Sequence, residues 1–200
     1  MTYNMEELKD LLLQVQKPAR YVGGEIGQTV KDLEQVDIRF AFCFPDIYDI
    51  GMSHLGLRIL YGALNEQEQT WCERVFQPWV DMEEKMREQG IRLYSLESHT
   101  TLDAFDIIGF TLQYEMCYPT VLNMLELGGV PLLSKDRAGL KNILVGGGPC
   151  AYNPEPLAPF FDIFSIGEGE EALPELADML RKARVEGWSR AQFLYEVSQI

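Results

Sequence analysis

The stretch FAFCFPDIYDIGMSHLGLRIL, which spans Phe40–Leu60, reads as a strand, a polar loop and the start of a helix. Its first five residues are apolar without interruption, a pattern typical of a strand covered on both faces of a sheet. The loop after Pro45 holds two aspartates, a tyrosine, a glycine, a methionine, a serine and a histidine. Such a concentration of small and polar residues at the carboxyl end of a buried strand indicates either a ligand site or a simple connection.

The rest of the chain repeats this alternation of strands and helices. Strands are predicted within residues 37–44, 71–76, 105–113, 140–148 and 161–169, and a further short strand within 91–98. Helices are predicted over residues 5–15, 114–129, 170–185 and 190–200. Another helix is predicted to begin after Ser53, its cap, and to end at about residue 67. A further helix is predicted to begin at Pro78, in the first helical position, and to stop at Gly90. Residues 154–161 are expected to form at most one helical turn, and residues 23–37 either a polar connector or a small hairpin. Five main strands in this rhythm predict an α/β fold of the doubly wound, flavodoxin-like (Rossmann-like) class, a parallel sheet with helices on both faces.

The composition narrows the classes of function. With 200 residues and 46% hydrophobic content, the chain is long enough for one domain with a substantial core. Its formal net charge of −14 disfavours binding to a nucleic-acid backbone or to an anionic membrane surface. No apolar run reaches the ~18–20 residues of a membrane span, and the acidic, amphipathic N-terminus does not resemble a secretory signal. We therefore expect a cytoplasmic protein.

The cysteines give no sign of a metal centre. Cys43, Cys72, Cys117 and Cys150 lie more than 25 residues from one another. Neither a CxxC nor a CxxxCxxC spacing is present, so the sequence predicts no metal ligands and no local iron–sulfur motif. Free, reduced thiols are the expectation for all four.

Four loops would meet at the carboxyl edge of the predicted sheet. They are the loop after the first strand, TLQYE at 111–115, GGGPCAYNPEP at 146–156 and GEGEE at 167–171. In doubly wound sheets, ligands bind outside the carboxyl ends of the strands at the topological switch point. The three glycines at 146–148 are explained equally well by a tight turn or by the close approach of a flat or phosphate-bearing ligand.

Two further features have competing explanations. The segment GEGEEA at 167–172 matches the GxGxxA dinucleotide fingerprint, but its glutamates stand where a pyrophosphate would lie and would repel it. Acidic residues at a helix N-terminus are better explained by their interaction with the helix dipole.

His54 is interpreted as a capping or solvent-facing residue and His99 as a loop residue, and neither can be assigned to a catalytic triad from sequence separation.

Three segments resemble a known family. They are FPDIYDIGMSHLGLRILYGALN at 44–65, LESHTTLDAFDIIGFTLQYEMCYPTVLNML at 96–125 and LVGGGPCAYNPEPLAPFFDIFSIGEGEEALPEL at 144–176. They look like the N-terminal cobalamin-binding-like domain of a family of radical S-adenosylmethionine (radical SAM) iron–sulfur proteins. The resemblance runs from about Arg20 to the end of the chain. Its most specific part is the succession of a glycine-rich strand end, a Pro-Glu-Pro turn, the FDIF strand and GEGEEAL.

The resemblance implies a role in a longer enzyme. In the family, this domain precedes a barrel whose CxxxCxxC motif holds a [4Fe–4S] cluster and which binds S-adenosylmethionine. The sequence is therefore interpreted as a fragment with a helix and connector at 1–36, a cobalamin-binding-like domain at 37–186 and a linker helix at 187–200 leading to the barrel. The implied function is to position cobalamin or a substrate over the radical-generating barrel. The implied partners are the protein's own radical SAM domain and an unknown substrate, and no residue of the fragment is predicted to be catalytic.

The chain departs from the family at one motif. Cobalamin domains that give a histidine to the cobalt have Asp-x-His-x-x-Gly after the first strand, and the spacing of Asp46, Asp49 and His54 does not match it. The companion Ser-x-Leu on the central strand reads Thr-Leu-Gln here. The resemblance therefore implies cobalamin held without histidine ligation. The residues implied to contact it are Gly51, Met52, Ser53, His54, Gly56, Thr111, Leu112, Gln113, Tyr114, Gly146, Gly147, Gly148, Gly167, Glu168 and Gly169.

Three alternatives are open. The first is a cofactor-free interaction module that guides a substrate, and a failure of the folded domain to take up cobalamin would support it. The second is a dinucleotide-binding domain that uses residues 167–172, which saturable binding of NAD or an adenine nucleotide would support. The third is a flavodoxin-like electron carrier, which is disfavoured because no phosphate-binding loop rich in Ser and Thr follows the first strand.

Overall fold

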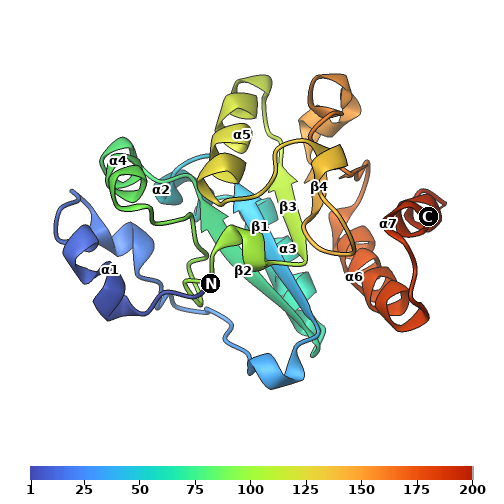
Figure 1. The fold of residues 1–200 in the computed structure, drawn as a ribbon, viewed down its shortest axis with the longest axis horizontal. Helices are drawn as coiled ribbons and strands as arrows, with labels where there is room; N and C mark the ends of the chain where they lie inside the picture. The colour runs from blue at the N-terminus through green and yellow to red at the C-terminus, as the bar shows by residue number, and fades with distance from the viewer. Residues whose placement is uncertain (200) are drawn as a thin grey trace.

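A five-stranded, all-parallel sheet forms the centre of the molecule (Figure 1). The structure is a computed structural model that describes residues 1–199. The strands are β1 Ile38–Phe44, β2 Thr70–Phe76, β3 Ile107–Thr111, β4 Ile143–Gly147 and β5 Ile163–Phe164. Their order in the sheet is β2-β1-β3-β4-β5, and every neighbouring pair is parallel. The winding direction changes between β1 and β3, so the switch point lies at the carboxyl ends of these two strands. The predicted flavodoxin-like α/β fold is confirmed.

Helices cover both faces of this sheet (Figure 1). The helices are α1 Met5–Leu12, α2 Tyr48–Gly51, α3 Leu55–Glu66, α4 Val80–Gln89, α5 Tyr118–Leu127, α6 Gly169–Glu186 and α7 Arg190–Val197. One buried cluster joins α1, α4 and α5 to one face of the sheet, and a second joins α3, α6 and α7 to the other face. Because both faces are covered, the central strands carry the predicted apolar runs, Phe40–Phe44 in β1 and Ile107–Phe110 in β3.

The central strand β3 is packed too closely for a side chain at its middle position. All five of its residues are buried. A Cβ placed on Gly109 would lie 2.8 Å from Cε1 of Phe40 on β1, which is closer than van der Waals contact allows. Gly109 therefore lets the Phe40 ring lie across the sheet between β1 and β3.

Three predicted helix starts were wrong. Helix α5 begins at Tyr118 and not at residue 114, because residues 115–117 form a 3-10 turn. The cap of α3 is His54 rather than Ser53, and the Ser53 hydroxyl instead donates to the Ile50 carbonyl at 2.8 Å. Helix α4 begins at Val80 after Trp79, so Pro78 lies before the helix and not at its first position. Gly90 ends α4 in the left-handed conformation with a φ of 67°, as predicted.

Two segments were ambiguous in sequence. Residues 91–98 do not form a strand, and in this segment Tyr94 makes only an isolated antiparallel bridge with Thr101. The segment between α1 and β1 is a connector with two short 3-10 turns, Pro18–Tyr21 and Leu33–Gln35, and holds no hairpin in the part of the chain described. The turn expected within 154–161 is present as a 3-10 turn at Glu155–Leu157.

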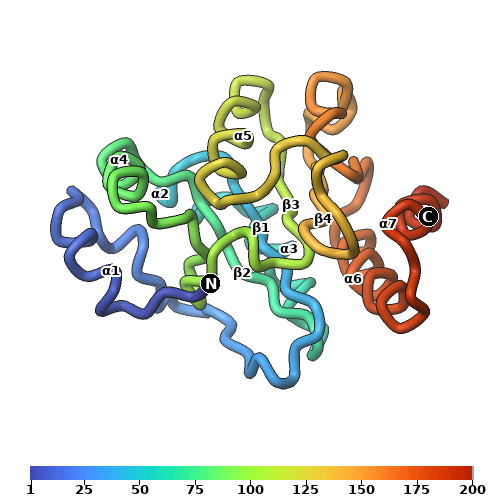
Figure 2. The backbone as a smooth tube through the Cα atoms, in the orientation of Figure 1, coloured from blue at the N-terminus to red at the C-terminus, as the bar shows by residue number. Residues whose placement is uncertain are grey.

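The connector is tied to the edge of the sheet by hydrogen bonds. The Lys31 ammonium donates to the carbonyls of Asn65, Gln67 and Thr70 at 2.8, 2.5 and 2.6 Å. The Trp71 indole donates to the Thr29 carbonyl at 3.1 Å. Figure 2 shows the connector running from α1 to the start of β1 along the outside of the fold. An edge strand covered in this way is protected from pairing with another chain.

The edge strand β2 also carries two buried ion pairs. Glu73 accepts hydrogen bonds from Arg39 and from Ser95, and its side chain is fully buried. Glu97 accepts from Nε of Arg74 at 2.6 Å, and burial raises its pKa to about 7 despite this guanidinium. The Arg39–Glu73 pair joins β1 to β2, while the Arg74–Glu97 pair and the hydrogen bonds from Ser95 and Ser98 to Glu73 hold the irregular segment that precedes β3 against β2.

In the described part of the chain, no helix has the length and apolar character required to cross a membrane.

Candidate functional site

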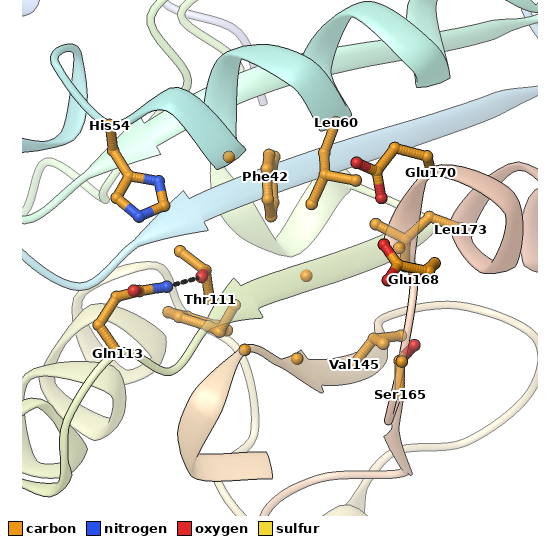
Figure 3. Close-up of a pocket in the computed structure, with 17 residues that line it drawn as sticks. Phe42, His54, Leu60, Thr111, Gln113, Val145, Ser165, Glu168, Glu170 and Leu173 are labelled. Atoms are coloured by element: carbon orange, nitrogen blue, oxygen red, sulfur yellow. Dashed lines mark hydrogen bonds between the residues drawn. The ribbon is translucent and has the colours of Figure 1, made fainter.

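A cavity of about 230 Å³ opens at the carboxyl edge of the sheet (Figure 3). Its lining comes from β1, β3 and β4, from the loops after β3, β4 and β5, and from the first two turns of α3 and α6. The lining residues are Phe42, His54, Gly56, Leu60, Gly109, Phe110, Thr111, Gln113, Val145, Gly147, Gly148, Ser165, Gly167, Glu168, Gly169, Glu170 and Leu173. This is the place where doubly wound sheets generally bind their ligands, outside the carboxyl ends of the strands at the switch point.

Glycines shape the walls of this cavity. A Cβ on Gly147 would meet nothing closer than the Ser165 carbonyl oxygen at 3.8 Å, so a side chain there would have room to enter the cavity. Gly148 has a φ of 91°, a left-handed conformation that other residues adopt rarely. The chain therefore leaves space at the end of β4 where a larger residue would fill it.

The polar groups of the cavity lie on two sides. On one side, the Gln113 amide donates to the Thr111 hydroxyl oxygen, and Thr111 is 8% exposed. On the other side, the carboxylates of Glu168 and Glu170 stand at the start of α6, and Figure 3 shows both pointing toward the cavity. Apolar side chains such as Phe42 and Leu60 lie between the two sides.

His54 caps a helix through one of its ring nitrogens. Its Nδ1 accepts a hydrogen bond from the Leu57 backbone N–H at 3.1 Å and so caps α3. A neutral imidazole that accepts at Nδ1 carries its proton on Nε2. The Nε2 atom then carries a hydrogen and has no lone pair to offer a metal. In a metal-bound histidine, the ring nitrogen that does not hold the metal normally donates its N–H to a neighbouring acceptor. Nδ1 of His54 instead accepts a hydrogen bond. The expectation that His54 does not ligate cobalt stays a prediction.

The structure brings together nine of the fifteen predicted contact residues. His54, Gly56, Thr111, Gln113, Gly147, Gly148, Gly167, Glu168 and Gly169 line the cavity. Their role in binding a cofactor stays a prediction.

The other six predicted residues do not line the cavity. Gly51 is buried beneath the Phe76 ring, and the Met52 sulfur contacts Nη1 of Arg74 at 3.3 Å. Ser53 is exposed and bonded to its own loop, and Tyr114 is 47% exposed. Leu112 and Gly146 face the other side of the sheet: Leu112 is fully buried, and a Cβ on Gly146 would meet Leu112, Phe164 and Phe161 at 3.1–3.2 Å.

Eight residues of the lining were not singled out from the sequence. Phe42, Leu60, Gly109, Phe110, Val145, Ser165, Glu170 and Leu173 supply most of the apolar surface and one of the two carboxylates. The strand period could have identified Phe42 and Gly109, because residues two apart on a strand face the same side. Leu60 and Leu173 lie on helices that only the tertiary packing brings to this place.

The cysteines lie in no site of their own. Cys43, Cys72 and Cys117 are buried, and burial raises the pKa of the Cys43 and Cys72 thiols well above the usual value. Buried thiols with a raised pKa are poor nucleophiles and poor metal ligands. Among the described residues, no group of three or more His, Cys, Asp or Glu side chains is arranged to hold a metal ion.

Comparison with known proteins gives the family. Residues 56–200 match the family described as radical SAM proteins, N-terminal. An uncharacterized protein of Methanocaldococcus jannaschii is 30% identical over 148 residues, which are 74% of this chain and 28% of the relative. The chain thus corresponds to a little over a quarter of that relative's length, and no solved structure matches it significantly. With its family match covering well over half of its length, the chain belongs to the family of N-terminal domains of radical SAM proteins.

Proposed function

We propose that this domain binds a cobalamin at the carboxyl edge of its sheet and presents it to the radical SAM domain of the same protein. The observation that carries the proposal is the glycine-walled cavity at the switch point, with apolar residues in its interior and polar residues at its sides. In the complete protein, the radical would come from S-adenosylmethionine at an iron–sulfur cluster outside this chain.

The cavity fits part of such a cofactor. Its volume of about 230 Å³ is below the roughly 300–1,000 Å³ of pockets for drug-sized ligands. It has room for a flat ring system such as the benzimidazole of cobalamin, whereas the corrin ring is too large and would lie outside the opening. Gly147 and Gly148 allow the ring to approach the backbone of β4, and Gln113 and Thr111 offer hydrogen bonds.

The surroundings of the opening support contact with another domain. Exposed apolar side chains follow three of the strands at this edge: Met116 is 83% exposed, Tyr152 74% and Ile166 58%. Large exposed apolar side chains that gather at one edge are typical of interaction sites. Placing a ligand at such an edge is what a domain that serves a neighbouring catalytic domain requires.

A titration of the purified domain with hydroxocobalamin tests the proposal. We expect stoichiometric binding, seen as co-elution in gel filtration, and a visible spectrum without imidazole ligation. Gly147→Trp should abolish binding, because the new side chain enters the cavity. Gly62→Trp is the matched control, since Gly62 lies on the exposed side of α3 with nothing within 4 Å of its Cβ position. Equal binding by both variants, or none by the unaltered domain at tens of micromolar, would refute the proposal.

A second candidate is a cofactor-free module that guides a substrate over the catalytic domain. The small cavity volume and the absence of a spare imidazole nitrogen at His54 favour it. The absence of cobalamin binding in the titration would make it the better account. A dinucleotide is disfavoured because its pyrophosphate would have to lie at the start of α6, where Glu168 and Glu170 would repel it, whereas only the benzimidazole ring of cobalamin, and not its single phosphate, is proposed to enter the cavity.

A further inference from the structure

A second, smaller cavity lies at the edge strand β2 and shares no lining residue with the cavity at the carboxyl edge of the sheet. Its walls come from β2, from α4 and the loop before it, from the 3-10 turn at Pro18–Tyr21 and from residues 93–96. Its volume of about 20 Å³ is enough for one water molecule or one small ion. Most of the lining is apolar, and the charged residues in it are Arg20 and Arg74.

Arg74 brings a buried donor to this cavity. The residue is 5% exposed, its Nε donates to Oε1 of Glu97 at 2.6 Å, and its Nη1 contacts the Met52 sulfur at 3.3 Å. Its Nη2 is buried and has no hydrogen-bond partner among the described residues. A buried donor without an acceptor costs free energy, so Nη2 calls for an acceptor in the adjoining cavity.

Arg20 and Tyr21 add further donors. Nε of Arg20 pairs with the carboxylate of Asp49 at 2.6 Å, and its two terminal nitrogens can donate elsewhere. The Tyr21 hydroxyl oxygen accepts from the Trp79 backbone N–H at 3.1 Å, so its own proton is available to an acceptor. Among the described residues, no Asp or Glu lines this cavity.

A cavity that offers donors and positive charge selects an anion. A buried water would need acceptors for its hydrogens, and a cation would be repelled by the two guanidinium groups. Acetate, phosphate and other polyatomic anions are too large for a cavity of about 20 Å³. We propose that this cavity binds a single halide ion, such as chloride, held by Arg74, Arg20 and Tyr21. The proposal does not depend on the function proposed for the carboxyl edge.

Glu97 competes with the halide for Arg74. Its carboxyl group is buried against the guanidinium, and burial raises its pKa to about 7. The other titratable groups that act on it are Glu73, Tyr61 and Cys72, and burial raises the pKa of the Tyr61 hydroxyl and of the Cys72 thiol, so both are neutral near pH 7. Because protonation of Glu97 removes the negative charge beside Arg74, the halide should bind more tightly at about pH 6 than at about pH 8.

A bromide titration of the whole chain tests the proposal. Binding is followed by NMR through the Nε–Hε signal of Arg74, which lines the cavity. Sodium bromide should shift this signal in a saturable way. Sodium acetate at the same ionic strength should not shift it, because acetate is too large to enter the cavity.

Two variants assign the binding to this cavity. Arg20→Met should weaken bromide binding about tenfold, because it removes one of the two charges that face the ion. Arg92→Met is the matched control, since it removes an arginine from another ion pair, the one with Asp103, outside this cavity. Glu97→Gln should tighten bromide binding at about pH 8 and abolish its dependence on pH.

The outcomes that would overturn the proposal are distinct. Equal shifts with bromide and acetate, or no saturable shift with bromide, would leave a water molecule as the occupant. Equal weakening by Arg20→Met and Arg92→Met would indicate a general effect of charge and no specific site. An unchanged bromide affinity in Glu97→Gln would show that the ion does not lie beside Arg74. The acetate comparison and Glu97→Gln keep the test decisive if Arg20→Met fails to fold.

Discussion

At the scale of single residues, the structure depends on positions where packing limits the size of the side chain or where burial makes its charge unfavourable. Gly109 is the clearest case, because any side chain there would meet the Phe40 ring. Glu97 is a second case, because it is a carboxyl group buried against one arginine. Each position leads to a measurable expectation.

Replacing Gly109 by alanine should lower the free energy of unfolding by about 1–3 kcal/mol, because the added methyl group overpacks the centre of the sheet. Chemical denaturation measures the change. Gly62→Ala is the matched control: Gly62 is in an exposed helix position with open space around it, so alanine should stabilise the protein by up to about 1 kcal/mol. Equal effects of both substitutions would contradict the packing described for β3.

Glu97 should make stability depend on pH in the direction opposite to most carboxylates. Burial raises its pKa in the folded protein from the ordinary value of 4.5 to about 7. Between these values the folded state binds more protons than the unfolded state, so this group's contribution to stability is full below pH ~4.5 and is lost as pH rises through about 7. In Glu97→Gln, the free energy of unfolding should decline less between pH 5 and 7.5 than in the unaltered protein. Chemical denaturation at several pH values measures this decline. An identical pH slope in both proteins would contradict the raised pKa.

At the scale of elements, the strands were predictable and the helix starts less so. Uninterrupted apolar runs such as residues 40–44 identify central strands, because a parallel sheet covered on both faces needs no polar residues there. The cap of α3 was misassigned because Ser53 and His54 both have side chains able to accept from a helix N-terminus, and only the backbone geometry decides between them. Residues 91–98 resemble a strand in composition but are held by the Arg74–Glu97 ion pair, by hydrogen bonds to Glu73 and by an isolated bridge, which no local pattern shows.

The connector between α1 and β1 could not be predicted because its partners are distant in sequence. Lys31 reaches the carbonyls at the end of α3 and the start of β2. Lys31→Met should therefore lower the free energy of unfolding by about 1–3 kcal/mol, since it leaves these acceptors without their charged donor. Limited proteolysis should also show faster cleavage within residues 22–36. Lys135→Met is the control, because Lys135 is exposed and forms no hydrogen bond or ion pair among the described residues, and it should change neither quantity.

At the scale of the whole molecule, the fold brings four loops to one edge, and this convergence was predicted from the sequence. Nine glycine and polar residues of the cavity were also predicted, because they follow strand ends or begin helices, whereas Gly109, Ser165 and Glu170 were missed. It did not identify the apolar lining from α3 and α6, because helix packing decides which leucines reach the cavity. The family match and the position of the cavity together support the proposal that this domain presents a ligand at the carboxyl edge of its sheet to the rest of a radical SAM protein.

The most direct test of that account is an NMR titration of the domain with hydroxocobalamin, read residue by residue. The account predicts that the amide signals of Gly109, Thr111, Gly147 and Gly167 shift in a saturable way, while those of exposed sites far from the cavity, such as Gly62 and Gly139, do not. Shifts that are absent, that do not saturate, or that gather away from the carboxyl edge of the sheet would contradict it.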